Sequence, residues 1–255
     1  MNEHMTPYDR LCILNGSSLN RGGIEIHYPT INEIVAMSYE LYNSMMVIFM
    51  TDTKEFFKDS NIPEEELADI TFIDVVLRQE SDFKEPAMLV LKTYFNQDFS
   101  ESIFLNEDGE MQAKGITIQG QPLTSELWES IRLLVLEMND LNTASEVEPV
   151  FTHPKAKEIW EKQKKAEEAR NKAKNGGGQT FEDVLCDIIS AVCSKSHTIT
   201  YSNVGDLNVY QLKDHLGKLI EIEAYDLNMM FAAHGAEIKD NKHWSESKSD
   251  TTGGK

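Results

Sequence analysis

Histidine and cysteine are the residues of this chain that most readily bind a metal or act as nucleophiles, and their spacing argues against both roles. The histidines are His4, His27, His153, His197, His215, His234 and His243. They include no His-Glu-x-x-His sequence and no pair four residues apart, which is how a helical zinc site begins. The cysteines Cys12, Cys186 and Cys193 have no metal-binding spacing and are too few for a disulfide framework. We therefore expect no metal and no other cofactor, and we expect Cys186 and Cys193 to be core residues.

Motifs for nucleophilic catalysis or phosphate binding are also missing from the sequence. There is no Gly-x-Ser-x-Gly sequence and no dinucleotide-binding fingerprint. Three successive glycines, Gly176, Gly177 and Gly178, lack the following Lys-Ser/Thr pair of a phosphate loop, so they indicate a hinge. We expect a protein without enzymatic activity, and a regulatory enzyme is the weakest of the alternatives.

The strongest pattern lies in residues 180–244 and predicts two packed helices. The first helix has an apolar face made by Phe181, Val184, Leu185, Ile188 and Val192. Thr180 opens this helix, with Asp183 in a variant of the capping box. The second helix begins after Asn208, with Gln211 at the capping-box position. Its apolar period comprises Val209, Leu212, Leu216, Leu219, Ile220, Leu227, Met230 and Phe231.

The first 150 residues predict a mainly helical lobe with a small β-hairpin or meander. Residues 7–28 indicate short extended pieces around glycine turns. A capping box formed by Thr30 and Glu33 then predicts one helix over residues 31–50. Residues 86–95 fit neither the helical nor the strand period cleanly, and we favour a helix there. The turn Asp108-Gly109 indicates a short meander, and Thr124 caps a final helix that ends near residue 142.

Residues 151–179 differ from the rest of the chain in charge. Residues 155–174 carry a net charge of +4, whereas the remaining chain carries −23. With the glycine hinge that follows, this stretch predicts a solvated linker. The expected organisation is an α+β, mainly α-helical fold. It comprises an N-terminal lobe (1–150), a charged linker (151–179), a smaller all-helical C-terminal lobe (180–244) and a disordered tail (245–255).

The net charge of −19 limits the choice of partners. An acidic surface repels both nucleic acid and anionic membranes, so we expect neither as a partner. No apolar run approaches the length of a membrane span. A basic or apolar protein surface is the expected partner, and self-association is left open.

Three stretches of the sequence resemble a family of tail assembly chaperones from long-tailed phages and prophages of low-GC Gram-positive bacteria. They are IHYPTINEI (26–34), ITYSNVGDLNVYQLKDHLGKL (199–219) and FAAHGAEIKDNKHW (231–244). The resemblance departs from the family at Gly205, where an aromatic residue is usual, and at the linker. It implies a protein that binds the tape-measure protein, keeps its long apolar helices in solution and helps tail-tube subunits to polymerise. It also implies a location in the cytoplasm of the infected host, and the rival is a structural protein retained in the virion.

The predicted second helix of the C-terminal lobe is too long for the first helix to cover. Its period spans about 33 Å at 1.5 Å per residue, and the first helix is about half as long. The first lobe, a second copy or a client helix must cover the remainder. A second stripe, Ile222, Tyr225 and Met229, faces away from the first by about a third of a turn, so we expect these residues to be exposed anchors. The predicted partner-binding set is Ile222, Tyr225, Met229, Met230, Leu207, Tyr210 and Trp244.

Overall fold

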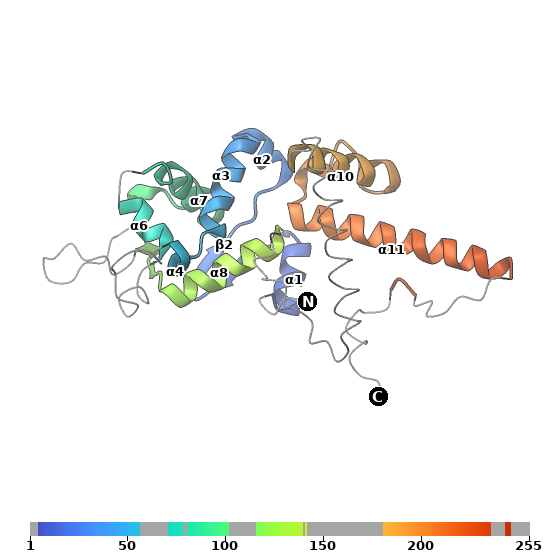
Figure 1. Cartoon of the computed structure of the whole chain (residues 1–255), viewed down its shortest axis with the longest axis horizontal. Coiled ribbons are helices and arrows are strands. Elements are labelled where there is room, and N and C mark those ends of the chain that lie inside the picture. The colour runs from blue at the N-terminus through green and yellow to red at the C-terminus, as the bar shows by residue number, and fades with distance from the viewer. Residues whose placement is uncertain are drawn as a thin grey trace, which may run out of the picture.

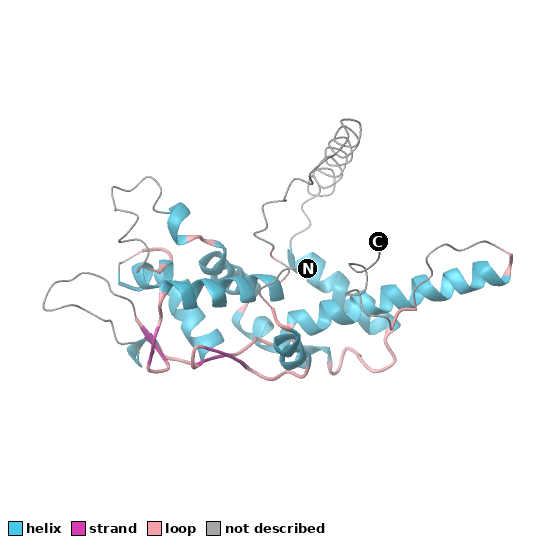
Figure 2. Ribbon diagram, turned by 90° about the horizontal axis from the view of Figure 1, so that it is seen from below, coloured by secondary structure: helices cyan, strands magenta, loops and turns pink. Residues whose placement is uncertain are grey.

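Helices dominate the structure, which confirms the predicted mainly α-helical α+β class. The computed structural model describes residues 5–56, 71–78, 81–101, 116–139, 141, 181–235 and 243–245. Two short antiparallel hairpins accompany the helices in these ranges (Figures 1 and 2). Within the same ranges, no helix has both the length and the apolar character needed to cross a membrane.

The first element among the described residues is helix α1 (Pro7–Leu14), so the prediction of extended structure over residues 7–14 is wrong. Thr6 caps α1 and forms a capping box with Asp9, and Pro7 occupies the first turn, where its missing N–H has no cost. The hairpin that follows is confirmed. Strands β1 (Leu19–Arg21) and β2 (Ile24–Ile26) pair antiparallel, joined by two glycines at positive φ.

The prediction of a single helix over residues 31–50 is wrong, because the helix is interrupted at Ser38. Helix α2 (Ile31–Met37) ends and α3 (Tyr39–Met50) begins at this residue, whose φ is +78°. The Ser38 side chain accepts a hydrogen bond from the Leu41 N–H and so caps α3. A serine that bonds to nearby backbone in this way competes with a continuous helix. A short helix, α4 (Thr53–Phe56), follows.

The rest of the N-terminal region builds its core from helices and one further hairpin. The elements are α6 (Phe72–Arg78), α7 (Lys84–Phe95), the 3-10 turn η1 (Phe99–Glu101), β3 (Thr117–Ile118), β4 (Gln121–Pro122) and α8 (Ser125–Met138). The helix favoured over residues 86–95 and the Thr124 cap are both confirmed. The Asp108-Gly109 turn lies outside the described residues. At the centre of the core, the Phe49 ring stacks on Trp128 at 5.5 Å and meets Tyr94 edge-on at 5.0 Å.

The C-terminal region contains α10 (Phe181–Lys195), the 3-10 turn η2 (Val204–Asp206) and α11 (Val209–Ala233). The Asn208–Gln211 capping box of α11 is confirmed, whereas the predicted Thr180 cap of α10 lies outside the described residues. Two details differ from expectation. Val184 is exposed rather than part of the packed face, and Cys186 is exposed rather than in the core.

The N-terminal and C-terminal regions pack directly against each other. Arg10 of α1 forms a 2.6 Å ion pair with Asp214 of α11, and Lys213 Nζ donates to the Asn139 carbonyl at 2.9 Å. Val209 and Leu212 of α11 belong to the same hydrophobic core as the N-terminal helices. The proposed division at residues 150 and 180 stays a prediction, since residues 151–179 and most of the tail lie outside the described residues.

Candidate partner-binding site

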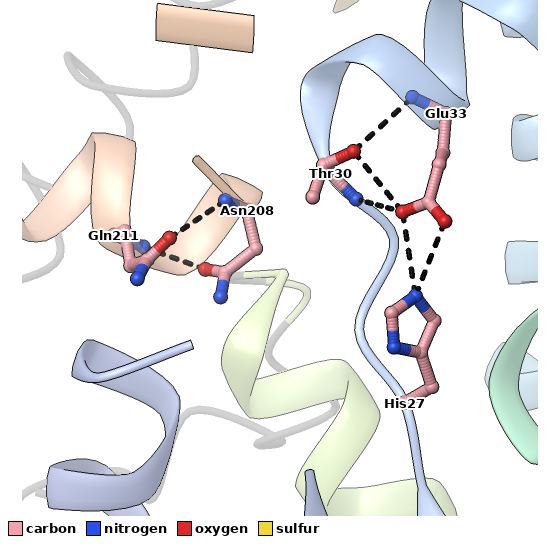
Figure 3. A network of polar contacts seen from close by, with 5 residues as sticks. All are labelled: His27, Thr30, Glu33, Asn208 and Gln211. Carbon is pink, nitrogen blue, oxygen red and sulfur yellow. Dashed lines mark hydrogen bonds and ion pairs between the residues drawn. The ribbon is translucent and has the colours of Figure 1, made fainter. Parts of the chain in front are cut away.

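Two capping boxes lie side by side where α2 and α11 begin (Figure 3). In the first, the Thr30 N–H donates to Glu33 Oε2 at 2.8 Å and the Glu33 N–H donates to Thr30 Oγ1 at 3.2 Å. In the second, Asn208 and Gln211 exchange two bonds of 2.8 Å. Each box satisfies two backbone N–H groups at the start of its helix.

Backbone bonds join the two boxes. Thr30 and Asn208 form an antiparallel β-bridge, and the Ile31 N–H donates to the Leu207 carbonyl at 2.8 Å. Thus two of the stretches that carry the family resemblance, residues 26–34 and 199–219, meet in space. The contacts between these two stretches fix the start of α11 against the start of α2.

Gly205 belongs to the same junction and allows a close approach. A Cβ atom at this position would lie 2.1 Å from Asn32 Oδ1. The Asn32 side chain in turn donates to Asp206 Oδ1 at 3.2 Å. Asn32 therefore occupies the space that a side chain at position 205 would need, which is a physical reason for glycine where the resembled family has an aromatic residue.

The carboxylate of Glu33 is held in its charged form at this junction. Burial raises its pKa, but hydrogen bonds from Thr30 and the neighbouring His27 outweigh this, so the pKa of Glu33 lies below its ordinary value. His27 Nε2 lies 3.3 Å from Glu33 Oε2 (Figure 3). A charged Glu33 at the start of α2 also interacts favourably with the positive end of the helix dipole.

The first half of α11 is covered by its neighbours. Val209 and Leu212 are buried, and Leu216 packs against the core from the same face. Helix α10 lies along this half and ends beside its middle, where Lys195 Nζ lies 2.8 Å from Glu223 Oε1. Ser196, the residue after α10, lies 3.1 Å from His215 Nε2.

The second half of α11 extends past the end of α10 (Figures 1 and 2). Four large apolar side chains are about half exposed on it: Ile220 58%, Leu227 46%, Met230 49% and Phe231 53%. At 100° per residue they lie within about 80° of Ile220, on the same face as Val209, Leu212 and Leu216. We call these four residues the exposed stripe. It continues the face that the protein covers along the first half of α11.

The predicted anchors of the second stripe lie on the opposite side of α11. Ile222 and Tyr225 are half-buried, and Met229 is 46% exposed. Tyr225 meets the His243 ring edge-on at 4.9 Å, and His243 lies 5.0 Å from the exposed Trp244. The structure therefore brings Tyr225 and Trp244 together through His243, near the middle of α11.

Leu207 and Tyr210 lie at the junction rather than on the second half of α11. Both are half-buried and pack against the hydrophobic core. Burial raises the pKa of the Tyr210 hydroxyl. Of the predicted partner-binding set, only Met230 belongs to the exposed stripe.

The sequence-based set omitted Ile220, Leu227 and Phe231, although the signal for them was present. Their period is that of the buried face, so periodicity alone assigns them inward. The difference in length between α10, with 15 residues, and α11, with 25 residues, is what indicates that part of this face stays uncovered.

An open cavity of about 810 Å³ lies beside the junction of α2 and α11, between β2, α2 and α7, and His27 and Glu33 line part of it. Its lining mixes apolar residues such as Met37 and Leu89 with charged ones such as Glu33 and Lys92. Among the described residues, no cluster of three or more His, Cys, Asp or Glu side chains is placed to hold a metal ion. Such a lining defines no reaction, so the exposed stripe is the better-defined candidate site.

The sequence comparison points to the same part of the chain. Residues 182–248 match the family model of the YomV second domain, a phage-derived family from a Bacillus prophage. This match indicates a phage protein. It covers most of α10 and all of η2 and α11, and so includes the exposed stripe. No curated protein and no solved structure gives a significant match to the chain.

Proposed function

We propose that this protein is a non-enzymatic tail assembly chaperone of a phage or prophage. The observation that carries the proposal is the exposed stripe, an uncovered continuation of a buried helical face. Its client is the tape-measure protein, whose long apolar helices need cover before the tail tube encloses them. An amphipathic client helix laid along α11 would complete the packing that α10 provides for the first half.

The size of the exposed stripe indicates that each contact is weak. Burying a large apolar side chain fully contributes about 1.5–3 kcal/mol, and these four are already about half buried, so the gain is on the order of 3–6 kcal/mol. Association costs roughly 4–15 kcal/mol before any gain appears. Many copies bound along one long client would therefore hold it together by avidity, and each could leave when tube subunits arrive.

The remaining properties of the proposal follow from charge and from the sequence. A net charge of −19 keeps a complex with an apolar client in solution and disfavours nucleic acid and anionic membranes as partners. We propose the tail-tube protein as a second, transient partner. The protein acts without a cofactor, in the cytoplasm of the infected host.

The proposal is tested by co-expressing the chain with the tape-measure protein. Replacing Leu227 and Phe231 together with aspartate should abolish co-purification and leave the client insoluble. The melting temperature should stay nearly unchanged, since both side chains are about half exposed. Val35→Asp is the matched control because Val35 is 73% exposed on α2, and it should bind normally. Normal binding by the double variant would refute the proposal.

Mass spectrometry of purified particles separates a chaperone from a structural virion protein. A chaperone should be absent or far below one copy per tail subunit. A fixed stoichiometry in finished particles would instead identify a neck, tail or baseplate component.

A further inference from the structure

Helix α10 shows which kind of partner the apolar face of α11 accepts. It is a single amphipathic helix that buries Leu185 and Val192. At its end it places a basic side chain, Lys195, against the acidic Glu223 of α11. One helix with an apolar face therefore covers the first half of α11, and the lysine at its end pairs with an acidic residue just past the middle of α11.

The exposed stripe has acidic residues beside it as well. Residues 219–234 include Glu221, Glu223 and Asp226 but no lysine or arginine. Lys218 lies 2.7 Å from Glu221, and Lys195 lies 2.8 Å from Glu223. Asp226 is exposed and forms no ion pair with any residue that the structure describes. Asp226 therefore gives the second half of α11 one negative charge that no residue described by the structure pairs with.

A second copy of the chain fits this surface poorly. Pairing two copies would bring the same acidic residues together, on two molecules that each carry a net charge of −19. Like charges brought together across an interface disfavour the complex. The electrostatics instead favour a partner of opposite charge.

We propose that the exposed stripe binds a basic amphipathic helix of the client, seated as a continuation of α10, with a lysine or arginine near Asp226. This inference rests on the proposed function and adds the chemistry of the client segment. Residues 220–231 span about 17 Å, so the contact needs about three turns of partner helix. Client helices that lack basic residues beside their apolar face should bind more weakly.

Synthetic peptides test the charge requirement with the full chain. The probes are two helical peptides of about 18 residues, a length at which an isolated helix can form. Both carry the same leucine stripe, and their flanking positions are all lysine in one and all glutamate in the other. Fluorescence anisotropy should show the lysine peptide binding at least about tenfold more tightly, with the difference shrinking as salt screens the charges.

Two variants locate the binding. Asp226→Lys should weaken the lysine peptide by about two- to fivefold, the range expected for an exposed ion pair, and should strengthen the glutamate peptide. Glu40→Lys makes the same charge change at an exposed position on α3 and should alter both affinities equally little. Leu227→Asp should remove binding of the lysine peptide.

The possible outcomes separate this inference from the proposed function. Equal binding of both peptides, or equal effects of Asp226→Lys and Glu40→Lys, would overturn the inference while capture of the tape-measure protein still stands. If the variant with aspartate at both Leu227 and Phe231 still captured the tape-measure protein, the proposed function itself would be overturned. A dimer in sedimentation that Leu227→Asp dissolves would show that a second copy occupies the stripe. Peptide binding that appears only after deletion of residues 155–174 would show that the chain's own basic segment occupies the exposed stripe.

Discussion

The two halves of α11 share one apolar period but have different surroundings. In the first half, Val209 and Leu212 are buried in the hydrophobic core to which α10 and the N-terminal helices also contribute. In the second half, Leu227 and Phe231 continue the same face and are about half exposed. The comparison teaches that the same pattern stabilises the fold in one place and stays available to a partner in the other, depending only on how far the neighbouring helix extends.

The largest difference between the halves should appear in stability. Leu212→Ala removes a fully buried side chain and should lower the free energy of unfolding by about 2–5 kcal/mol. Leu227→Ala should change it by no more than about 0.5 kcal/mol, since the side chain is about half exposed. Denaturant unfolding of both variants measures the contrast, and equal losses would show that the second half is part of the core.

Acid should destabilise α1, the helix that packs against the first half of α11, through protonation of Asp9. Burial raises the Asp9 pKa, but hydrogen bonds from Arg21 and Thr6 outweigh it, so the pKa lies below its ordinary value. The Asp9 carboxylate receives bonds of 2.6 Å from both Arg21 and Thr6. A lowered folded pKa means that its stabilisation is complete above the unfolded pKa of about 3.9 and is lost as pH falls through the folded value.

Asp9→Asn tests this contribution. The variant should lose roughly 1.5–3 kcal/mol of stability at pH 7, the range for hydrogen bonds to a charged group. Its stability should also fall less between pH 5 and pH 2 than that of the unaltered chain. A parallel pH profile of the two proteins would contradict the account.

A smaller effect is expected at the start of α11. Asn208→Ala removes the capping bond to the Gln211 N–H and a 3.4 Å contact with the Ile13 carbonyl. Loss of such a cap costs about 1 kcal/mol. Thr30→Ala removes the matching cap of α2 and should lower the free energy of unfolding by a similar amount. Thermal unfolding of both variants measures these losses. If neither variant changes the melting temperature, the double capping box does not anchor the helix.

Gly217 lies between the two halves, and its replacement should give a small change of the opposite sign. A Cβ atom here would meet no atom within 4 Å, so Gly217→Ala should stabilise the protein by about 0.5–1 kcal/mol through helix propensity. Gly235→Ala is the opposing control, because its φ of +88° is strained for any residue with a side chain. A destabilising Gly217→Ala would mean that another surface packs closely over this turn.

Much of the fold could be predicted because local signals agree with the packing. The capping boxes at Thr30 and Asn208 each mark a helix start at the correct residue. The break at Ser38 could not be predicted, because residues 31–50 keep a helical period across it. Helix α1 was missed for another reason. The glycine turns that follow it favour extended structure, whereas the Thr6–Asp9 capping box favours a helix.

The candidate site was harder to predict for a physical reason. Periodicity reports which residues share a face but not what covers that face. Leu212 and Leu227 are therefore equivalent in the sequence and differ only through the end of α10. Tyr225 was likewise expected to be exposed, whereas the structure places the His243 ring, 18 positions further along, against it.

Hydrogen–deuterium exchange along α11, with and without the tape-measure protein, tests the central claim most directly. In the free chain, amides of residues 224–233 should exchange faster than those of residues 212–219, because fewer packed contacts hold them. Adding the tape-measure protein should slow exchange over residues 220–231 and leave residues 209–216 unchanged. Protection that appears elsewhere in the chain, with none along the exposed stripe, would contradict the account.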